Sequence, residues 1–541
     1  MKLVTVEQMK TIEQEADANG LSYDEMMRNA GQGLADVALD IFEDEPEPEV
    51  LGLVGPGNNG GDTLVAMTHL LKAGWKAQAY LIKRKTTDEL VKAFQEAGGE
   101  IISASKDKEF ESLASALENV DLLLDGVLGT GIQLPLKDDV AEVLNETNAI
   151  LEELDESPFV IAVDCPSGID CGTGEAADEC IPADLTVTMA AVKQGLLKLP
   201  AFEFVGDLEV VDIGLPDDLP SLRALQVEVV VAETVAEILP ERPLDSHKGT
   251  FGTALIAAGS VNYTGAALLS GQAAYRVGAG LVTMAIPASL HGTLAGQFPE
   301  ATWILLPHEV GVISESAAEV LKKNFERATA LLIGPGFGTE EKTKEFIENL
   351  LNEKSSPKKS GARIGFVHGE DKSEEKTFQL PPMVVDADAL KLLAKISDWQ
   401  KKLPAPAILT PHPGEMSVLC GLSKEEIQEN RLGVARRFAQ EWGHVVVLKG
   451  AFTVIASPDG RATIIPVASP ALARAGTGDV LAGLVVGLRA QGVDAYDASL
   501  AGAWIHAQAG LYAADDLGAT ASVLAGDVLN SVSDVLSELE S

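Results

Sequence analysis

The sequence predicts a protein of two α/β domains, and three observations lead to this prediction. The chain has 541 residues, whereas a single hydrophobic core stops growing at roughly 250–300 residues. Apolar residues make up 46% and charged residues 23% of the chain, which is the balance of a soluble globular protein. Short apolar runs alternate with helical stretches in both halves, an order typical of parallel sheets covered by helices. We therefore expect one domain over residues 1–221 and a second over residues 222–541.

The first half begins with two predicted helices, in which apolar side chains recur every three or four positions. Ligands of parallel sheets bind at the carboxyl ends of the strands, so the residues after each strand of this half form the candidate site. The helices are expected at 5–18, 24–42, 63–72, 88–97 and 139–154, and the strands at 50–54, 77–82, 121–125 and 159–164.

The second half repeats this alternation after a Pro- and Asp-containing connection at 216–243, which carries one short predicted strand at 227–231. Residues 352–379 are rich in Lys, Glu, Ser and Gly, and we interpret them as an exposed insertion without a catalytic role. A long helix is expected at 266–277, and strands at 254–258, 281–286, 330–333, 383–386, 407–409 and 444–449.

The chain is strongly acidic, with 81 Asp and Glu against 41 Lys and Arg and a formal net charge of -40. Nucleic acids and anionic lipids attract basic surfaces, so we expect neither as a partner. No apolar run reaches the roughly 18 residues of a membrane helix, and residues 1–20 show no signal-peptide core. These features predict a cytoplasmic protein, which we expect to form a homo-oligomer through its helical surfaces. The 4 cysteines form no CxxC pair, so no zinc site is expected.

The segment Leu53–Asp62 reads LVGPGNNGGD and joins a predicted strand to a predicted helix. Bare N–H groups and the dipole at a helix start form a phosphate site, and glycine lets a ligand approach the backbone. Glycines 55, 57 and 60 also fit the GxGxxG pattern of Rossmann dehydrogenases. The ribose-binding acid expected about 20 residues later is missing, because Lys-Arg-Lys stands at 83–85. A tight strand-to-helix turn without a ligand is the structural alternative.

Two aspartates, Asp125 and Asp164, end apolar runs at the same predicted edge of the sheet. One such residue is often a helix cap, but two of them beside a glycine loop favour a site. One could act as a general acid or base. The other could bind a cation, because carboxylate, amide and carbonyl oxygens suit hard ions.

Three segments of the first half, NNGGD, LDGVLGTG and VDCPSGID, resemble the NAD(P)H-hydrate epimerase domain over about residues 5–215. The resemblance implies a Rossmann-like three-layer sandwich in which Asp164 is the acid/base, and a potassium ion is held by Asn59, Asp125 and Ser167. Epimerisation at carbon six of the hydrated ring needs ring opening or transient loss of the hydroxyl, and the sequence does not choose between them. The phosphates of the hydrate would bind to Asn58, Asn59, Gly60, Gly61, Asp62, Gly129, Thr130, Gly131, Ile132, Gln133, Leu134 and Pro135.

The segment Ala475–Gly483 of the second half reads AGTGDVLAG. Its glycines would open a helix whose N–H groups hold a transferring phosphoryl group, while Asp479 takes a proton from the acceptor hydroxyl. No Walker A sequence occurs in the chain, which excludes P-loop chemistry. The Gly-Thr-Gly-Asp quartet before an Ala/Gly-rich helix resembles the ribokinase-like kinases and implies an α/β/α domain.

Further segments extend this resemblance, from about residue 227 onward, to the NAD(P)H-hydrate dehydratase domain, a ribokinase-like family. They read HKG, LIGPGFG, VVDADAL, TPHPGE and VLKGAFT, in chain order from 247 to 453. The resemblance implies that ADP or ATP, with Mg²⁺ on its phosphates, donates phosphate to the ring hydroxyl, and that phosphate then leaves. The implied nucleotide contacts are Lys449, Gly450, Ala451, Phe452, Thr453 and Gly478. The implied hydrate contacts are Ala266, Gly338, His412 and Asp479.

Three alternatives stay open at this point. The second half by itself permits a plain kinase for a small hydroxylated ring, which would leave a stable phosphorylated product. The first half could be a catalytically silent dinucleotide-binding module. Its GxGxxG pattern also permits an NADP dehydrogenase.

Overall fold

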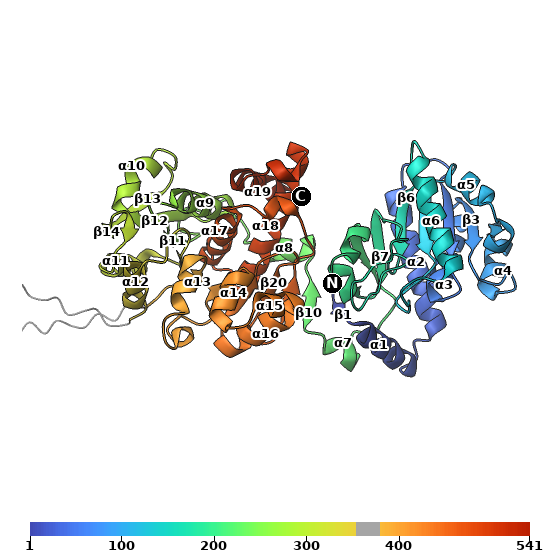
Figure 1. The fold of residues 1–541 in the computed structure, drawn as a ribbon, viewed down its shortest axis with the longest axis horizontal. Coiled ribbons are helices and arrows are strands. Elements are labelled where there is room, and N and C mark those ends of the chain that lie inside the picture. Colours follow the sequence, from blue (N-terminus) through green and yellow to red (C-terminus); the bar gives the residue numbers. More distant parts are fainter. Residues whose placement is uncertain (353–378, 541) are drawn as a thin grey trace, which may run out of the picture. The chain divides into compact units, whose positions relative to one another are not determined.

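The computed structural model describes residues 1–352 and 379–540, and the chain forms two compact units, Met1–Val229 and Val230–Ser541 (Figure 1). Each unit is an α/β structure built around its own sheet, as the sequence predicts. The domain boundary predicted after residue 221 stays a prediction. The insertion predicted at 352–379 lies, except for its two end residues, outside the described residues.

The sheet of the first unit is parallel throughout, in the order β4-β3-β2-β5-β6-β7-β9. The strand order reverses between β2 and β5, and such a switch point opens a crevice at the carboxyl ends of the strands. The strands are β2 (Glu49–Val54), β3 (Lys76–Leu81), β4 (Glu100–Ser103), β5 (Leu122–Gly126), β6 (Phe159–Val163), β7 (Leu185–Met189) and β9 (Asp207–Val211).

Helices cover both faces of this sheet because neighbouring strand residues point in opposite directions. Val50 and Ile161 pack against α2 and α3, whereas Leu51 and Val160 pack against α5 and α6. The helices are α1 (Val6–Ala18), α2 (Tyr23–Ile41), α3 (Asn58–Lys72), α4 (Glu89–Glu96), α5 (Glu111–Leu117) and α6 (Asp138–Glu153).

The structure corrects the sequence prediction at several places in this unit. The segment NNGGD forms the first turns of α3, which begins at Asn58 and not at residue 63. Strands β4, β7 and β9 were not predicted from the sequence; β4 and β9 lie at the sheet edges, where half-exposed side chains blur the apolar pattern. A loop rather than a helix precedes β7, so the expected alternation fails there.

The sheet of the second unit runs β21-β20-β19-β18-β17-β16-β11-β12-β13, and its order reverses between β11 and β16. In this order, the strands from β19 across to β13 are parallel. At the other end of the sheet, β20 pairs antiparallel with β19, and β21 pairs antiparallel with β20. The strands are β11 (Thr253–Ala257), β12 (Leu281–Pro287), β13 (Thr302–Leu306), β16 (Ala330–Ile333), β17 (Met383–Val385), β18 (Ile408–Leu409), β19 (Val445–Leu448), β20 (Val454–Ala456) and β21 (Ala462–Ile464).

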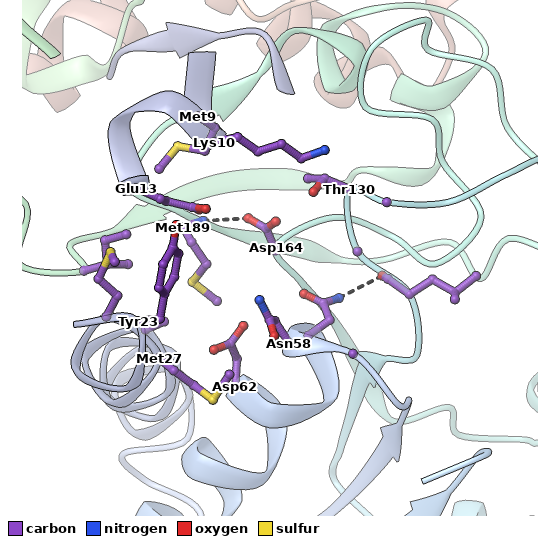
Figure 2. A pocket seen from close by; sticks show the side chains of 18 of the residues that line it. Met9, Lys10, Glu13, Tyr23, Met27, Asn58, Asp62, Thr130, Asp164 and Met189 are labelled. Atoms are coloured by element: carbon purple, nitrogen blue, oxygen red, sulfur yellow. Dashed lines mark hydrogen bonds between the residues drawn. The ribbon is translucent and has the colours of Figure 1, made fainter. Parts of the chain in front are cut away.

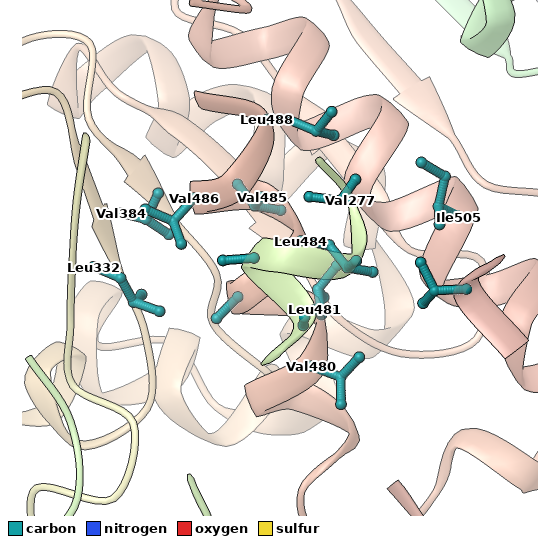
Figure 3. Close-up of a cluster of buried hydrophobic side chains, with 14 of the residues drawn as sticks. Val277, Leu332, Val384, Val480, Leu481, Leu484, Val485, Val486, Leu488 and Ile505 are labelled. Atoms are coloured by element: carbon teal, nitrogen blue, oxygen red, sulfur yellow. The ribbon is translucent and has the colours of Figure 1, made fainter. Parts of the chain in front are cut away.

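The larger core of this unit lies between the sheet and α9 (Thr264–Arg276), α17 (Thr477–Ala490) and α18 (Ala495–Leu517). Figure 3 shows apolar side chains of α17, with Val486 beside Val384 of β17. On the opposite face, α12 (Glu341–Leu351) and α13 (Asp388–Leu393) complete a three-layer sandwich. This packing fixes the start of α17, where AGTGD lies.

Candidate active sites

A cavity of about 620 Å³ lies at the carboxyl ends of the first unit's strands, beside the switch point between β2 and β5. Residues of α1 and α2 line it from one side, and the loops after β5 and β6 line it from the other (Figure 2). The predicted site residues that line it are Asn58, Asn59, Asp62, Gly129, Thr130, Gly131, Ile132 and Asp164.

Other residues predicted to bind the phosphates lie outside the lining of this cavity. Gly60 has a packing role, because a Cβ atom there would lie 2.1 Å from the carbonyl oxygen of Gly55. The glycine therefore lets α3 start directly against the loop. Asp125 and Ser167 are fully buried below the cavity. The remaining predicted residues outside the lining are Gly61, Gln133, Leu134 and Pro135.

Asp164 is held rigidly at the edge of the cavity. Its backbone is left-handed, with φ 65°, a conformation that costs energy for a residue with a side chain. Its Oδ1 atom accepts hydrogen bonds from Met189 N at 3.0 Å, from Thr188 Oγ1 at 3.2 Å and from Lys193 Nζ. Among the described residues, Oδ2 has no hydrogen-bond partner, so this oxygen remains for a ligand in the cavity.

Lys193 is a functional residue that the sequence reasoning missed. Its side chain is 2% exposed, and its ammonium group also donates to Thr188 Oγ1 at 3.0 Å and Met189 O at 2.9 Å. A usable signal was present, because Lys193 is the sole charged residue between 185 and 197. Lysine in an otherwise apolar segment is seldom buried without a partner.

We expect the substitution Lys193→Met to lower the free energy of unfolding by about 3 kcal/mol, because it leaves the Asp164 carboxyl, 14% exposed, without its counter-charge. Chemical denaturation of the full chain measures this. Adding Asp164→Asn to Lys193→Met should restore part of the loss. The exposed Lys72→Met is the matched control and should change stability by less than about 0.5 kcal/mol. A loss below about 1 kcal/mol for Lys193→Met would refute this account of the pair.

Of the three residues predicted to hold potassium, Asn59 lines the cavity, and Asp125 and Ser167 are buried next to it. Asp125 accepts hydrogen bonds from Ser167 at both carboxylate oxygens, from Oγ at 2.5 Å and from the backbone N at 2.7 Å. The Asn59 amide donates to Leu128 O at 2.8 Å, and Ser167 Oγ accepts from Leu128 N at 2.9 Å. The donor set consists of carboxylate, amide, hydroxyl and carbonyl oxygens, which fits a hard cation.

A second cavity, of about 410 Å³, lies between the start of α17, α18 and the loop after β19. Six of the predicted residues line it: His412, Lys449, Gly450, Ala451, Thr453 and Gly478. Phe452, Ala266, Gly338 and Asp479 do not.

Arg474 and His506 also line this second cavity, and the sequence reasoning missed both. Burial lowers the pKa of His506 to about 4, so its imidazole is neutral. Among the described residues, its Nε2 atom has no hydrogen-bond partner. His506 is the sole ionisable residue between 498 and 511 of the sequence, which could have identified it.

A buried charge cluster lies beside this cavity and includes Asp479. Lys449 Nζ donates to Asp386 Oδ1 at 2.7 Å, and Thr410 Oγ1 donates to the same oxygen at 2.6 Å. Burial, and after it the charge of Asp386, raises the pKa of Asp479 to about 7. A carboxyl that titrates near neutral pH is suited to take and return a proton.

Two of the predicted hydrate contacts have structural partners. The backbone N of Gly338 donates to Asp388 Oδ2 at 3.0 Å. His412 caps α14 (Pro413–Cys420), with Nδ1 accepting from the backbone N of Gly414 at 3.0 Å. The imidazole is half exposed at the cavity, and its Nε2 atom lies 3.3 Å from Glu415 Oε1.

Comparison with known proteins supports the family resemblance found in the sequence for each half of the chain. A family model described as YjeF-related protein N-terminus matches residues 23–195. A model described as NAD(P)H-hydrate dehydratase matches residues 254–357 and 369–532. Within residues 1–352 and 379–540, every helix is too short or too polar to span a bilayer.

Full-length relatives carry both units. The bifunctional NAD(P)H-hydrate repair enzyme of Moorella thermoacetica is 35% identical over 95% of this chain and 92% of its own. That of Thermofilum pendens is 32% identical over 96% of this chain and 93% of its own. The ADP/ATP-dependent NAD(P)H-hydrate dehydratase of Bacillus subtilis, co-crystallised with ATP and Mg²⁺, is 30% identical and covers 58% of this chain and 100% of its own, with a TM-score of 0.46. The chain belongs to the family of bifunctional NAD(P)H-hydrate repair enzymes.

Proposed function

We propose that the first unit interconverts the R and S hydrates of NAD(P)H at Asp164, and that the second unit dehydrates the S form with ADP or ATP through Asp479. The first assignment rests on the hydrogen bonds that Asp164 accepts. Its Oδ1 atom is fixed by three donors and its Oδ2 atom is left to the cavity. The half-buried Asp479, which follows Gly478 of the second cavity, supports the second.

In the first unit, the hydrate is anchored by its phosphates at the start of α3 and at the loop containing Gly129–Ile132. The helix start supplies N–H groups and a favourable dipole, as an anionic ligand requires. The anchored ring then meets the Oδ2 atom of Asp164, which exchanges a proton with it. Because Lys193 holds Oδ1, the carboxylate does not need to reorganise when the proton moves.

We further propose that Asn59, Asp125 and Ser167 hold a potassium ion. Their oxygen donors support this, since they include a carboxylate that is 1% exposed and has no basic partner among the described residues. When bound, the ion would supply a fixed positive charge near the anionic ligand.

In the second unit, the adenine nucleotide occupies the cavity formed by Lys449–Thr453 and Gly478, with Mg²⁺ carried on its phosphates. Asp479 removes the proton from the ring hydroxyl, so that the oxygen can attack the terminal phosphorus. Hydroxide is a poor leaving group and phosphate a good one. The ring nitrogen's electron pair then expels phosphate and forms a C=N⁺ bond to carbon six. Loss of a proton from carbon five restores NAD(P)H. His412 and Gly338 would contact the ring, and Ala266 would lie against it.

We also propose that the chain acts in the cytoplasm, as a homo-oligomer and without a nucleic-acid partner. The net charge of -40 supports the last point, because a phosphate backbone would be repelled.

The test uses the full chain with a mixture of R and S NADH hydrates, Mg²⁺, potassium and either ADP or ATP, and follows the absorbance of reduced nicotinamide. We expect complete recovery of NADH from both epimers, with at least one nucleotide required. Recovery of only the S share would refute the epimerase assignment. A stable phosphorylated product without NADH would favour a plain kinase.

The same assay tests the potassium proposal. Replacing potassium by lithium should slow the recovery of NADH from the R hydrate. The rate of recovery from the S hydrate should stay unchanged. Equal rates in both salts would remove the ion from the proposal.

A further inference from the structure

Asp62 is a buried carboxyl group that the proposed mechanism does not yet use. It lies in the second turn of α3, is 8% exposed and lines the same cavity as Asp164 (Figure 2). In the part of the chain that the structure describes, its oxygens form neither a hydrogen bond nor an ion pair. Asp125 and Asp164, by contrast, each accept several. A buried polar group without a partner is costly, so a ligand in the cavity is expected to form a hydrogen bond with Asp62.

The two basic side chains that lower the pKa of Asp62, Lys193 and Arg84, have partners of their own. Lys193 donates to Asp164, Thr188 and Met189. Arg84 donates to the carbonyl oxygens of Gly55 and Gly57, and it pairs with Asp88 at 3.1 Å.

Acidic groups face Asp62 from several elements. Asp164 lies after β6, and Glu13 and Asp24 project from α1 and α2 into the same cavity, together with Lys10 and Tyr23. Burial, followed by the charge of Asp164, raises the pKa of Asp62 well above its usual range. Both causes disfavour the ionised form of the Asp62 carboxyl.

We propose that Asp62 is a second catalytic residue of the first unit. It donates a proton on one face of the ring, and Asp164 accepts a proton on the other face. The proposal rests on the epimerase function proposed for this unit. Epimerisation moves a hydroxyl from one face of carbon six to the other. A single acid/base group reaches one face, whereas Asp62 and Asp164 enter the cavity from different elements.

Epimerisation through loss of the hydroxyl needs one proton transfer from Asp62 and one to Asp164. The Asp62 carboxylic acid gives its proton to the hydroxyl oxygen, the bond from carbon six to oxygen breaks, and the ring nitrogen's electron pair forms a C=N⁺ bond. Water is released. A water molecule then adds to the opposite face, the electron pair returns to nitrogen, and Asp164 takes the proton of the added water. Asp164 then releases its proton to solvent, Asp62 takes one from solvent, and the reverse reaction exchanges the two roles.

The test compares the full chain with Asp62→Asn, using purified R hydrate without nucleotide, so that the second unit stays silent. We expect kcat to fall about 10²-fold or more, with KM within a few-fold of wild type. In wild type the rate should fall at high pH as Asp62 loses its proton, and in Asp62→Asn this decline should disappear. Infrared spectra at pH 7 should show a protonated carboxylic acid in wild type that is missing from the variant.

Three comparisons make the test decisive. Asp36→Asn, on the exposed side of α2, is the matched control and should behave as wild type. A loss that appears only in KM, with the high-pH decline unchanged, would show that Asp62 merely binds the hydrate and would overturn the proposal. So would a kcat within threefold of wild type. If wild type itself failed to epimerise while dehydrating the S form, the epimerase function would be refuted, and the catalytic role of Asp62 with it.

Discussion

Replacing Asp164 by asparagine is expected to slow epimerisation by about 10²- to 10⁴-fold, while the second unit keeps its full dehydratase rate. The amide is close to isosteric with the carboxyl and can still accept from Met189 N at the same position. The backbone strain at φ 65° should therefore change little, so the loss would be in proton transfer. Measuring the conversion of R to S hydrate, and in parallel the dehydration of purified S hydrate with nucleotide, separates the two units.

Asp155→Asn is a suitable control, because Asp155 is an exposed aspartate in the loop before β6. It should leave both activities unchanged. An Asp164→Asn protein that epimerises at the wild-type rate would remove Asp164 from the chemistry. Equal losses in both activities would instead indicate damage to the whole chain.

Replacing Asp479 by asparagine is expected to reduce dehydration of the S hydrate by about 10²- to 10⁴-fold, with epimerisation intact. The expected pH dependence follows from the pKa of Asp479, which burial and Asp386 raise to about 7. As a base, Asp479 must be ionised, so the wild-type rate should rise as pH increases through about 7. The residual rate of Asp479→Asn should lack this rise. Steady-state kinetics between pH 5.5 and 8.5, with saturating nucleotide and Mg²⁺, give both quantities.

Asp516→Asn, at the exposed end of α18, provides the matched control and should retain the rise. A variant at position 479 that loses rate but keeps the same pH profile would mean that another group is the base. Lys449 and Asp386 form the neighbouring ion pair at 2.7 Å, and substitutions there would be examined next.

The sequence by itself determined the α/β class, both glycine-containing motifs and the aspartates at positions 125, 164 and 479. These features are local. Strand and helix periodicity is written in neighbouring residues, and an aspartate directly after an apolar run must lie at the carboxyl edge of the sheet. The start of α3 was misplaced for a local reason as well, because Asn-Asn-Gly-Gly disfavours a helix by propensity. Packing of Gly60 against Gly55 overrides that preference.

The tertiary structure alone decided which groups complete the two sites. Lys193 lies 29 residues from Asp164 along the chain, and the parallel pairing of β6 with β7 brings the two segments together. Glu13 and Tyr23 reach the first cavity from helices that precede the sheet, and His506 reaches the second from α18. The protonation state of Asp62 depends on its burial and on the cations nearby being engaged elsewhere. Burial and long-range pairing are properties of the folded chain, and no local pattern of residues encodes them.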